Sequence, residues 1–379
     1  MSATASVPLR LSVDRIRLYG VGCVIMGLSP FAVLLPRWLR YGTSQGDFAN
    51  YWAAGSTVGT PVLMTPGALA TWQSARHLAP QPFVYPPGFA WFYVPFAHMP
   101  PTVAMIAELL CMFALCALAG WLLTEIYGFQ PWFGQLVVFA WAPALLSVEI
   151  GQNTVLALVL MLAATLGLIR RNPILTGLAV GFLLYKPNEA LTLVLLLAVR
   201  REWRALCIVA GCAAGWYLLS VPASNGDWAW PVRYLQIVHA WYIMDFPLNA
   251  SKAFTLPGVL IESGVPALVA FGVAAAMILS ALPLLARLPL LEAAAMATLV
   301  GLAANVHAWH YEAALLLPAI GYAIRYLHEP WRTRIVGATY IAVAIGMVTP
   351  QAAHLLSIVC IGGTVWWIAS GYRNLRLAT

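Results

Sequence analysis

Long apolar runs separated by short polar turns dominate the chain from residue 102 to residue 371. A run of about 20 apolar residues is typical of a helix that crosses the hydrocarbon core of a bilayer. The pattern predicts about twelve spans, several of them short enough to be tilted or re-entrant. Their approximate ranges are 18–35, 102–124, 132–149, 153–169, 173–185, 188–199, 205–221, 257–284, 288–306, 311–326, 335–349 and 352–371. A break near Pro266 is expected inside one of them, because proline interrupts a helix.

Two long segments interrupt this pattern, and both are polar and aromatic. Residues 37–100 and 222–256 lack a convincing apolar run, so we expect them to be large loops between spans. The first loop is expected to carry short interfacial helices near 48–58 and 66–77. Two prolines exclude a regular helix at Tyr85-Pro86-Pro87, which is expected to be structural. With no internal repeat in the sequence, residues 1–379 are expected to form a single membrane domain.

Composition supports the same class of protein. The chain is 62% hydrophobic and only 9% charged, whereas soluble domains carry roughly 25% charged residues. The apolar runs are continuous rather than alternating, which disfavours a transmembrane β-barrel. We therefore predict an all-α, polytopic transmembrane helical bundle. The six cysteines lie in apolar runs without metal-ligand spacing and are expected to be small buried hydrophobic residues.

The basic residues orient the predicted bundle. With both termini in the cytoplasm, 14 of the 20 Lys and Arg residues fall on the cytoplasmic side, as the positive-inside rule requires. The six exceptions fall on or near the opposite face, and they are Arg37, Arg40, Arg76, Lys186, Arg233 and Lys252. Both long loops and most other polar residues belong to that outer face. Function is therefore expected on the periplasmic or extracellular side of the plasma membrane.

Asp47 is the most prominent acidic residue of that face, just past the first predicted span. As an Asp, it is well suited to cap a helix that begins at about Phe48. The other interpretation is a general base beside a sugar, because Tyr51 and Trp52 follow it and aromatic rings stack on sugars. Both interpretations remain open at this point.

Three further polar positions occur at turns of the outer face. Gln152 and Asn153 belong either to an ordinary tight turn or to a set of amides that line a cavity. Lys186 sits beside a proline at the end of a short span, where a buried, unpaired ammonium is costly. It either extends to the interface or binds an anion, and Glu189 is its expected local partner.

His307 and His310 are followed at once by Tyr311 and Glu312. The spacing is a poor match to zinc motifs, so no metal is predicted. Two histidines at a helix start are able to hold a phosphate, and interfacial packing is the other interpretation. Arg233 is expected either to contact a phosphate or lipid headgroup or to be solvated.

The ordered motifs together resemble a known family. They are Gly46-Asp47-Phe48-Ala49-Asn50-Tyr51-Trp52, Tyr85-Pro86-Pro87, Gly151-Gln152-Asn153, Tyr185-Lys186-Pro187 and His307-Ala308-Trp309-His310-Tyr311. Each is weak alone, but their order and spacing resemble family 87 of the GT-C glycosyltransferases, the polyprenyl-phosphate-mannose-dependent α-mannosyltransferases. The resemblance implies a GT-C fold, a lipid-linked donor used on the outer face, and Asp47 as the catalytic base. It also implies that Lys186 and the His307/His310 region line the donor phosphate or the cavity.

The predicted function is an inverting transfer of a sugar, with mannose favoured, from a polyprenyl phosphate to a glycolipid or glycan acceptor, without a cofactor. The alternatives are a transporter or flippase of a lipid-linked sugar, a GT-C transferase for another sugar such as arabinose, and an acyltransferase with His310 as base. Transporters usually show internal repeats, which this sequence lacks. Convergence of Asp47, Lys186 and His310 is the structural observation that favours an enzyme.

Overall fold

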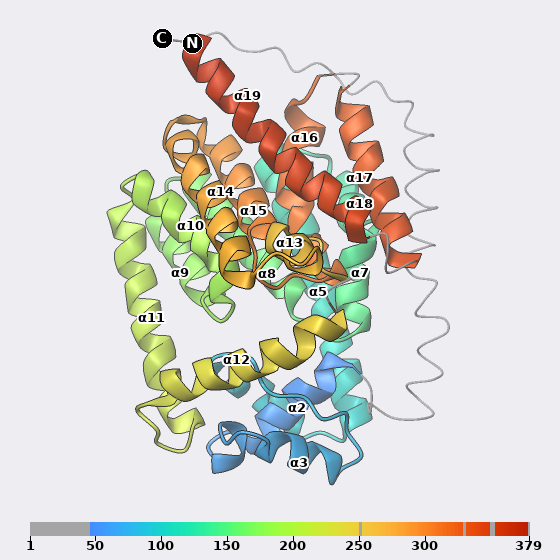
Figure 1. The fold of residues 1–379 in the computed structure, drawn as a ribbon, viewed down its shortest axis with the longest axis vertical. Coiled ribbons are helices and arrows are strands. Elements are labelled where there is room, and N and C mark those ends of the chain that lie inside the picture. The colour runs from blue at the N-terminus through green and yellow to red at the C-terminus, as the bar shows by residue number, and fades with distance from the viewer. Residues whose placement is uncertain (1–45, 250–251, 329–330, 349–352, 378–379) are drawn as a thin grey trace.

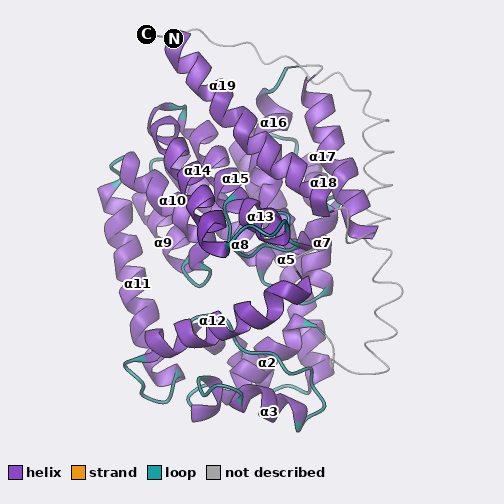
Figure 2. Cartoon of the chain, in the orientation of Figure 1, coloured by secondary structure: helices purple, strands orange, loops and turns teal. Residues whose placement is uncertain are grey.

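The protein is built from helices. The computed structural model describes residues 46–249, 252–328, 331–348 and 353–377, and these residues contain no strand. Figure 1 shows most helices packed together in one body, with α2 (Asp47–Thr57) and α3 (Ala68–Ser74) at one end. Helix α12 (Trp230–Asn249) lies across the molecule next to that end. Figure 2 shows helices joined by loops and turns, and it draws no strand in the described part of the chain. The all-α prediction is confirmed for these residues.

Several helices have the properties of membrane spans. Three are long and apolar enough to cross a bilayer alone, namely α5 (Pro101–Tyr127), α11 (Trp203–Ala223) and α14 (Ala267–Arg287). Four shorter apolar helices accompany them, and these are α8 (Thr154–Ile169), α9 (Pro173–Leu183), α10 (Pro187–Val199) and α15 (Leu290–Ala303). A membrane protein is therefore supported. The number of twelve spans stays a prediction, and the first of them, 18–35, falls outside the described residues.

Two short helices form the centre of the bundle. Eleven of the fourteen residues of α15 and twelve of the sixteen of α8 are buried. The close approach of α15 to α10 depends on a small residue, because a Cβ added at Gly301 would lie 2.4 Å from the hydroxyl oxygen of Thr192 in α10. By contrast, two leucines of α14 are exposed, Leu268 with 85% and Leu279 with 63% of its surface. Such outward leucines fit a helix that faces lipid.

Prolines set several helix boundaries, as expected. Helix α13 (Leu256–Glu262) ends before Pro266, and α14 begins directly after it, so the predicted break is confirmed. The first long loop contains α2 and α3 close to the predicted positions. At Pro86 the chain enters a 3₁₀ helix, Pro87–Tyr93, rather than an α-helix. The backbone N–H of Gly88 in this turn donates to the Ser220 hydroxyl of α11 at 2.9 Å, which ties the loop to the bundle.

Two predicted elements differ in detail from the structure. The span at 132–149 is two helices, α6 (Pro131–Phe139) and α7 (Ala142–Glu149), which meet at an angle of 63°. Pro143 in the first turn of α7 lacks the N–H that a continuous helix needs. The loop at 222–256 contains the 20-residue helix α12. Its aromatic residues pack against the 307–311 segment, and this tertiary contact is invisible in the local pattern.

The remaining helices form the C-terminal part of the fold. The 3₁₀ helix His310–Leu316 leads directly into α16, and a five-residue π-helical segment, Ile358–Gly362, joins α18 to α19. The bounds are α16 (Leu317–Tyr326), α17 (Trp331–Val348), α18 (Ala353–Ser357) and α19 (Gly363–Leu377). Figure 1 places α16, α17 and α19 at the end of the molecule opposite to α2 and α3.

Candidate active site

Asp47 is held by a contact between two distant turns. Gly46, at φ 113°, turns the chain into α2, and the Asp47 backbone N–H donates to the carbonyl of Ile150 at 2.9 Å. The helix begins at Asp47 itself, with Gly46 as the residue before it, so the predicted cap role of Asp47 is wrong. Its side chain instead turns toward Gln152.

Gly151 allows the second turn to approach so closely. It has φ 70°, and a Cβ added there would lie 2.5 Å from the Cβ of Phe48. Only glycine tolerates both the positive φ and this distance. The same turn is closed by the Ser147 hydroxyl, which donates to the Gln152 carbonyl at 2.9 Å. The turn between α7 and α8 is therefore fixed against the start of α2.

Gln152 is the centre of the resulting hydrogen-bond network. Its Nε2 donates to Oδ2 of Asp47 at 2.7 Å, and its Oε1 accepts from the Tyr51 hydroxyl at 2.8 Å. The hydroxyls of Tyr51 and Tyr85 lie 2.8 Å apart, and both rings are buried. Because a tyrosine donates to Oε1, the amide presents its N–H groups to the carboxylate. Gln152 therefore orients Asp47, whereas the sequence suggested only a turn or a cavity lining.

The electrostatics of Asp47 combine opposing effects. Burial raises the pKa of its carboxyl above the ordinary value, and the Asp245 charge adds to this increase. The hydrogen bond from Gln152 and the charge of Lys186 act in the opposite direction, because both favour the ionised form. Asp47 and Lys186 are therefore close enough to influence one another.

Lys186 is buried, with 5% of its surface exposed. Its Nζ lies 3.4 Å from Oε1 of Glu312 and 3.4 Å from the Thr154 hydroxyl oxygen. Glu189, the predicted partner, instead accepts a hydrogen bond of 2.7 Å from Asn305, so that pairing is wrong. Both contacts of the ammonium are long for charge-assisted hydrogen bonds. Lys186 therefore keeps capacity for a further, closer anionic partner.

Asn153 lies next to this lysine at the start of α8. Its backbone carbonyl accepts from the Tyr185 hydroxyl at 2.9 Å, which fixes the residue in place. The side chain is fully buried, and its Nδ2 has no hydrogen-bond partner among the described residues. A buried amide donor of this kind normally has a partner. The site thus offers a buried ammonium and a buried amide donor without a hydrogen bond.

His307 lies on the segment before the 3₁₀ helix His310–Leu316, and His310 is the first residue of that helix. The His307 ring stands edge-on between Trp241 and Trp309, with ring centroids 4.6 and 4.4 Å away. Burial lowers the pKa of His307 to about 3, and burial also lowers the pKa of His310. Both imidazoles are therefore neutral at neutral pH. Within the described parts of the chain, no group of three or more His, Cys, Asp or Glu side chains is placed to hold a metal.

Two predicted site residues have other contacts. Arg233 pairs with Asp227 at 2.9 Å, and its side chain is about half exposed, at 54%. Trp52 donates from its indole nitrogen to the carbonyl of Phe96 at 3.1 Å and packs against Trp72. Tyr51 does belong to the network around Asp47, but as a donor to Gln152.

The comparison with protein families decides the family. A family model described as glycosyltransferase family 87 matches residues 83–308, well over half of the chain. The chain belongs to glycosyltransferase family 87. The predicted resemblance is confirmed, and this family makes the protein a membrane glycosyltransferase. The comparisons with curated proteins and with solved structures found no match.

The matched region of this family 87 protein contains part of the site. Gln152, Asn153, Lys186 and His307 lie inside it, whereas Asp47 and His310 lie beyond its ends. The structure joins the two parts, since Gln152 of the matched region holds Asp47. Tyr311, beside His310, has its hydroxyl 3.4 Å from Nε2 of the same glutamine.

Sequence reasoning missed two acidic residues at the site. Glu312 pairs with Lys186 and also accepts from the Trp309 backbone N–H at 2.9 Å. It appeared in the sequence only as a neighbour of the histidines. Asp245 was hidden in the segment expected to be a loop, and it influences Asp47 electrostatically. Helical spacing within 230–249 was the signal that could have placed Asp245 on a defined face.

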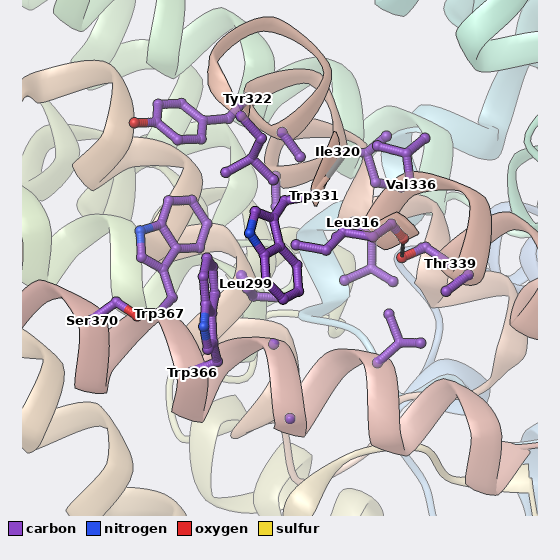
Figure 3. A pocket seen from close by; sticks show the side chains of 18 of the residues that line it. Leu299, Leu316, Ile320, Tyr322, Trp331, Val336, Thr339, Trp366, Trp367 and Ser370 are labelled. Carbon is purple, nitrogen blue, oxygen red and sulfur yellow. Dashed lines mark hydrogen bonds between the residues drawn. The ribbon is translucent and has the colours of Figure 1, made fainter. Parts of the chain in front are cut away.

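A separate cavity lies between α15, α16, α17 and α19. Its volume is about 510 Å³, and Figure 3 shows Tyr322, Trp331, Trp366 and Trp367 around it. Its acidic side chain, Glu292, accepts from the Trp367 indole at 3.0 Å. The lining is aromatic and aliphatic and lacks Asp47, Lys186 and both histidines. The acid–base groups of the candidate site are therefore elsewhere.

Proposed function

We propose that this glycosyltransferase moves a sugar from a polyprenyl-phosphate donor to a hydroxyl of an acceptor, with inversion and with Asp47 as general base. The observation that carries the proposal is the oriented carboxylate of Asp47, held at 2.7 Å by Gln152 within the electrostatic reach of the buried Lys186. A base beside a buried cation suits a reaction in which a proton leaves the acceptor and negative charge develops on a leaving phosphate.

The geometry of the carboxylate supports its role as a base. Gln152 occupies Oδ2, while Oδ1 has no hydrogen bond from any of the residues described. That oxygen is available to the acceptor hydroxyl. As the acceptor oxygen attacks the anomeric carbon, its proton passes to Asp47 and the bond between that carbon and the phosphate oxygen breaks. Attack opposite to the leaving phosphate inverts the anomeric configuration.

The groups around Lys186 support a phosphate site. The ammonium lies at the start of α10, and the unpartnered Asn153 amide lies at the start of α8. Helix starts carry partial positive charge and free N–H groups, which favour anions. Together these groups would offset the charge that develops on the leaving phosphate. We leave Arg233 out of this site because its guanidinium already pairs with Asp227.

Substrate and location complete the proposal. The donor favoured by the family resemblance is polyprenyl-phosphate mannose, and the acceptor is a glycolipid or a glycan. The distribution of basic residues supports a site on the outer face of the plasma membrane, with both termini in the cytoplasm. His310 and His307 belong to the substrate-binding surface as neutral side chains rather than as cations.

The test is transfer activity in proteoliposomes. Purified protein is incubated with several radiolabelled polyprenyl-phosphate sugars and an extract of membrane glycolipids, and the products are identified by mass spectrometry. We expect a glycosylated product with at least one donor, inverted at the anomeric carbon. Asp47→Asn should abolish transfer while donor binding remains. Substantial transfer by this variant would refute the base assignment, and translocation of donor without transfer would support a flippase.

A further inference from the structure

One face of α12 lies against the segment that carries the two histidines. The rings of Trp241 and His307 are 4.6 Å apart, and those of Phe246 and Trp309 are 6.2 Å apart. Tyr242 and Phe246 are four residues apart and share this face, and Asp245 follows Trp241 at the same spacing. In Figure 1, α12 crosses the molecule beside the end that holds α2.

This contact zone contains polar atoms that have no partner. In the described parts of the chain, Tyr242 Oη, Asp245 Oδ2, His307 Nδ1 and His310 Nε2 are buried without a hydrogen bond. The other oxygen of Asp245 accepts from the Asn249 side chain at 2.9 Å, which holds the carboxylate in place. Buried polar groups in native proteins are normally hydrogen-bonded. Four such atoms within one zone therefore indicate a place for a polar ligand.

The zone borders the catalytic carboxylate. The charge of Asp245 is one of the effects that raise the pKa of Asp47, so the two carboxyl groups are near one another. Tyr311 follows His310 in the chain, and its hydroxyl lies 3.4 Å from Nε2 of Gln152, the residue that holds Asp47. A ligand in the zone would therefore lie within reach of the base.

Charge decides which ligand fits. A phosphate would be repelled by the carboxylates of Asp245 and Asp47, and both imidazoles are neutral. Lys252 acts electrostatically on Asp245 and His310, but its Nζ already donates to Oδ1 of Asn249 at 2.7 Å. A sugar is uncharged, donates hydroxyl hydrogens to carboxylate and imidazole acceptors, and packs its C–H faces on aromatic rings. Trp241 is partly exposed and offers such a ring.

We propose that this zone, formed by Trp241, Tyr242, Asp245, His307 and His310, binds a saccharide of the acceptor. Asp245 and His310 accept hydrogen bonds from its hydroxyls, and Trp241 packs against its ring. The inference rests on the proposed function and extends it, since it names a sugar as the acceptor group next to Asp47. The donor phosphate then lies near Lys186, and the acceptor sugar lies near α12.

The first experiment measures binding without catalysis. Octyl α-D-mannoside, below its critical micelle concentration, is titrated into the protein in lipid nanodiscs by calorimetry. We expect Asp245→Asn to weaken binding by about tenfold, because one hydrogen bond to a charged group is lost. Trp241→Ala should weaken binding similarly, and Trp241→Phe should restore most of it. Asp227→Asn is the matched control, since Asp227 already pairs with Arg233, and it should bind like the unmodified protein.

The second experiment measures transfer from polyprenyl-phosphate mannose to the same glycoside. Asp245→Asn should raise KM for the glycoside about tenfold and leave KM for the donor unchanged. A raised donor KM alone, or unchanged binding in the variants, would overturn the subsite. The subsite would also be overturned if the unmodified protein did not bind the glycoside, or if binding required a divalent cation. If no donor supports transfer although the glycoside binds and Asp245→Asn weakens it, the proposed function fails and the saccharide site stands.

Discussion

Gln152→Met tests how the network controls the carboxylate of Asp47, the proposed general base. Methionine keeps the length and much of the volume of glutamine but cannot donate a hydrogen bond to Asp47. The bond that is lost is short, at 2.7 Å from Nε2 to Oδ2. The hydroxyls of Tyr51 and Tyr85 remain bonded to each other at 2.8 Å, so neither tyrosine is left without a partner. The substitution therefore acts mainly on Asp47.

The magnitude follows from the type of bond. A hydrogen bond to a charged group contributes about 1.5–3 kcal/mol, and 1.36 kcal/mol corresponds to one pKa unit. Since the bond from Gln152 lowers the pKa of Asp47, its loss should raise that pKa by about one to two units. A base must be deprotonated, so activity rises with pH through this pKa. The acidic limb of the profile of kcat/KM should therefore move to higher pH by the same one to two units. Loss of orientation should also reduce the plateau by about tenfold or more.

The assay is sugar transfer in proteoliposomes, measured from pH 4 to pH 9 for the unmodified protein and the variant. Gln73→Met is the matched control. Gln73 is also buried and loses comparable bonds, since its side chain donates to Asn50 at 3.2 Å and accepts from the Gln81 N–H at 2.7 Å. Its bonds do not involve Asp47, so its acidic limb should stay in place. Thermal unfolding of both variants separates loss of fold from loss of function.

The proposed role of Gln152 would be refuted if the acidic limb of kcat/KM did not move in Gln152→Met and if its plateau equalled that of Gln73→Met. The glutamine would then be a structural part of the turn, and Asp47 would not depend on it. A limb that moves equally in both variants would also contradict the prediction, because the cause would be a general loss of packing.

Three further substitutions test other parts of the site. Gly151→Ala should lower the thermal unfolding temperature more than Gly264→Ala does. Both glycines have a positive φ, but only the Cβ added at residue 151 would meet a neighbour, because it would lie 2.5 Å from the Cβ of Phe48. Lys186→Met combined with Glu312→Gln, which avoids an unpaired buried carboxylate, should raise donor KM by about tenfold or more. Tyr51→Phe should lower the free energy of unfolding by about 1 kcal/mol, measured by chemical unfolding. It should reduce kcat by less than Gln152→Met does, because the Tyr85 hydroxyl still reaches Oε1 of Gln152 at 3.4 Å.

Local features of the fold were predictable from the chain. Apolar runs, proline positions and helix-start signals act over a few residues, so α2, α3 and the break at Pro266 were placed closely. The motifs that contain Asp47, Gln152 and Lys186 were also recognisable, because their residue types are unusual in such an apolar sequence. The family followed from the order of these motifs, and the match over residues 83–308 confirms it.

Pairings between distant residues were decided by the tertiary structure. Gln152 and Asp47 are 105 residues apart, and Lys186 and Glu312 are 126 apart. The sequence left a helix cap open as one interpretation of Asp47, and it suggested the nearby Glu189 as the partner of Lys186. A buried polar group bonds to whichever partner packing brings to it, and packing depends on contacts such as that between Gly151 and Phe48.

Helix α12 shows the same division between sequence and structure. Its residues are polar and aromatic enough to suggest a loop, yet they form a 20-residue helix against the histidine segment. That packing brings Asp245 near Asp47. The sequence alone determined a helical membrane protein of this family with a carboxylate and a lysine at its polar turns. The tertiary structure decided which side chains meet them, because burial and long-range contact energies outweigh local preference.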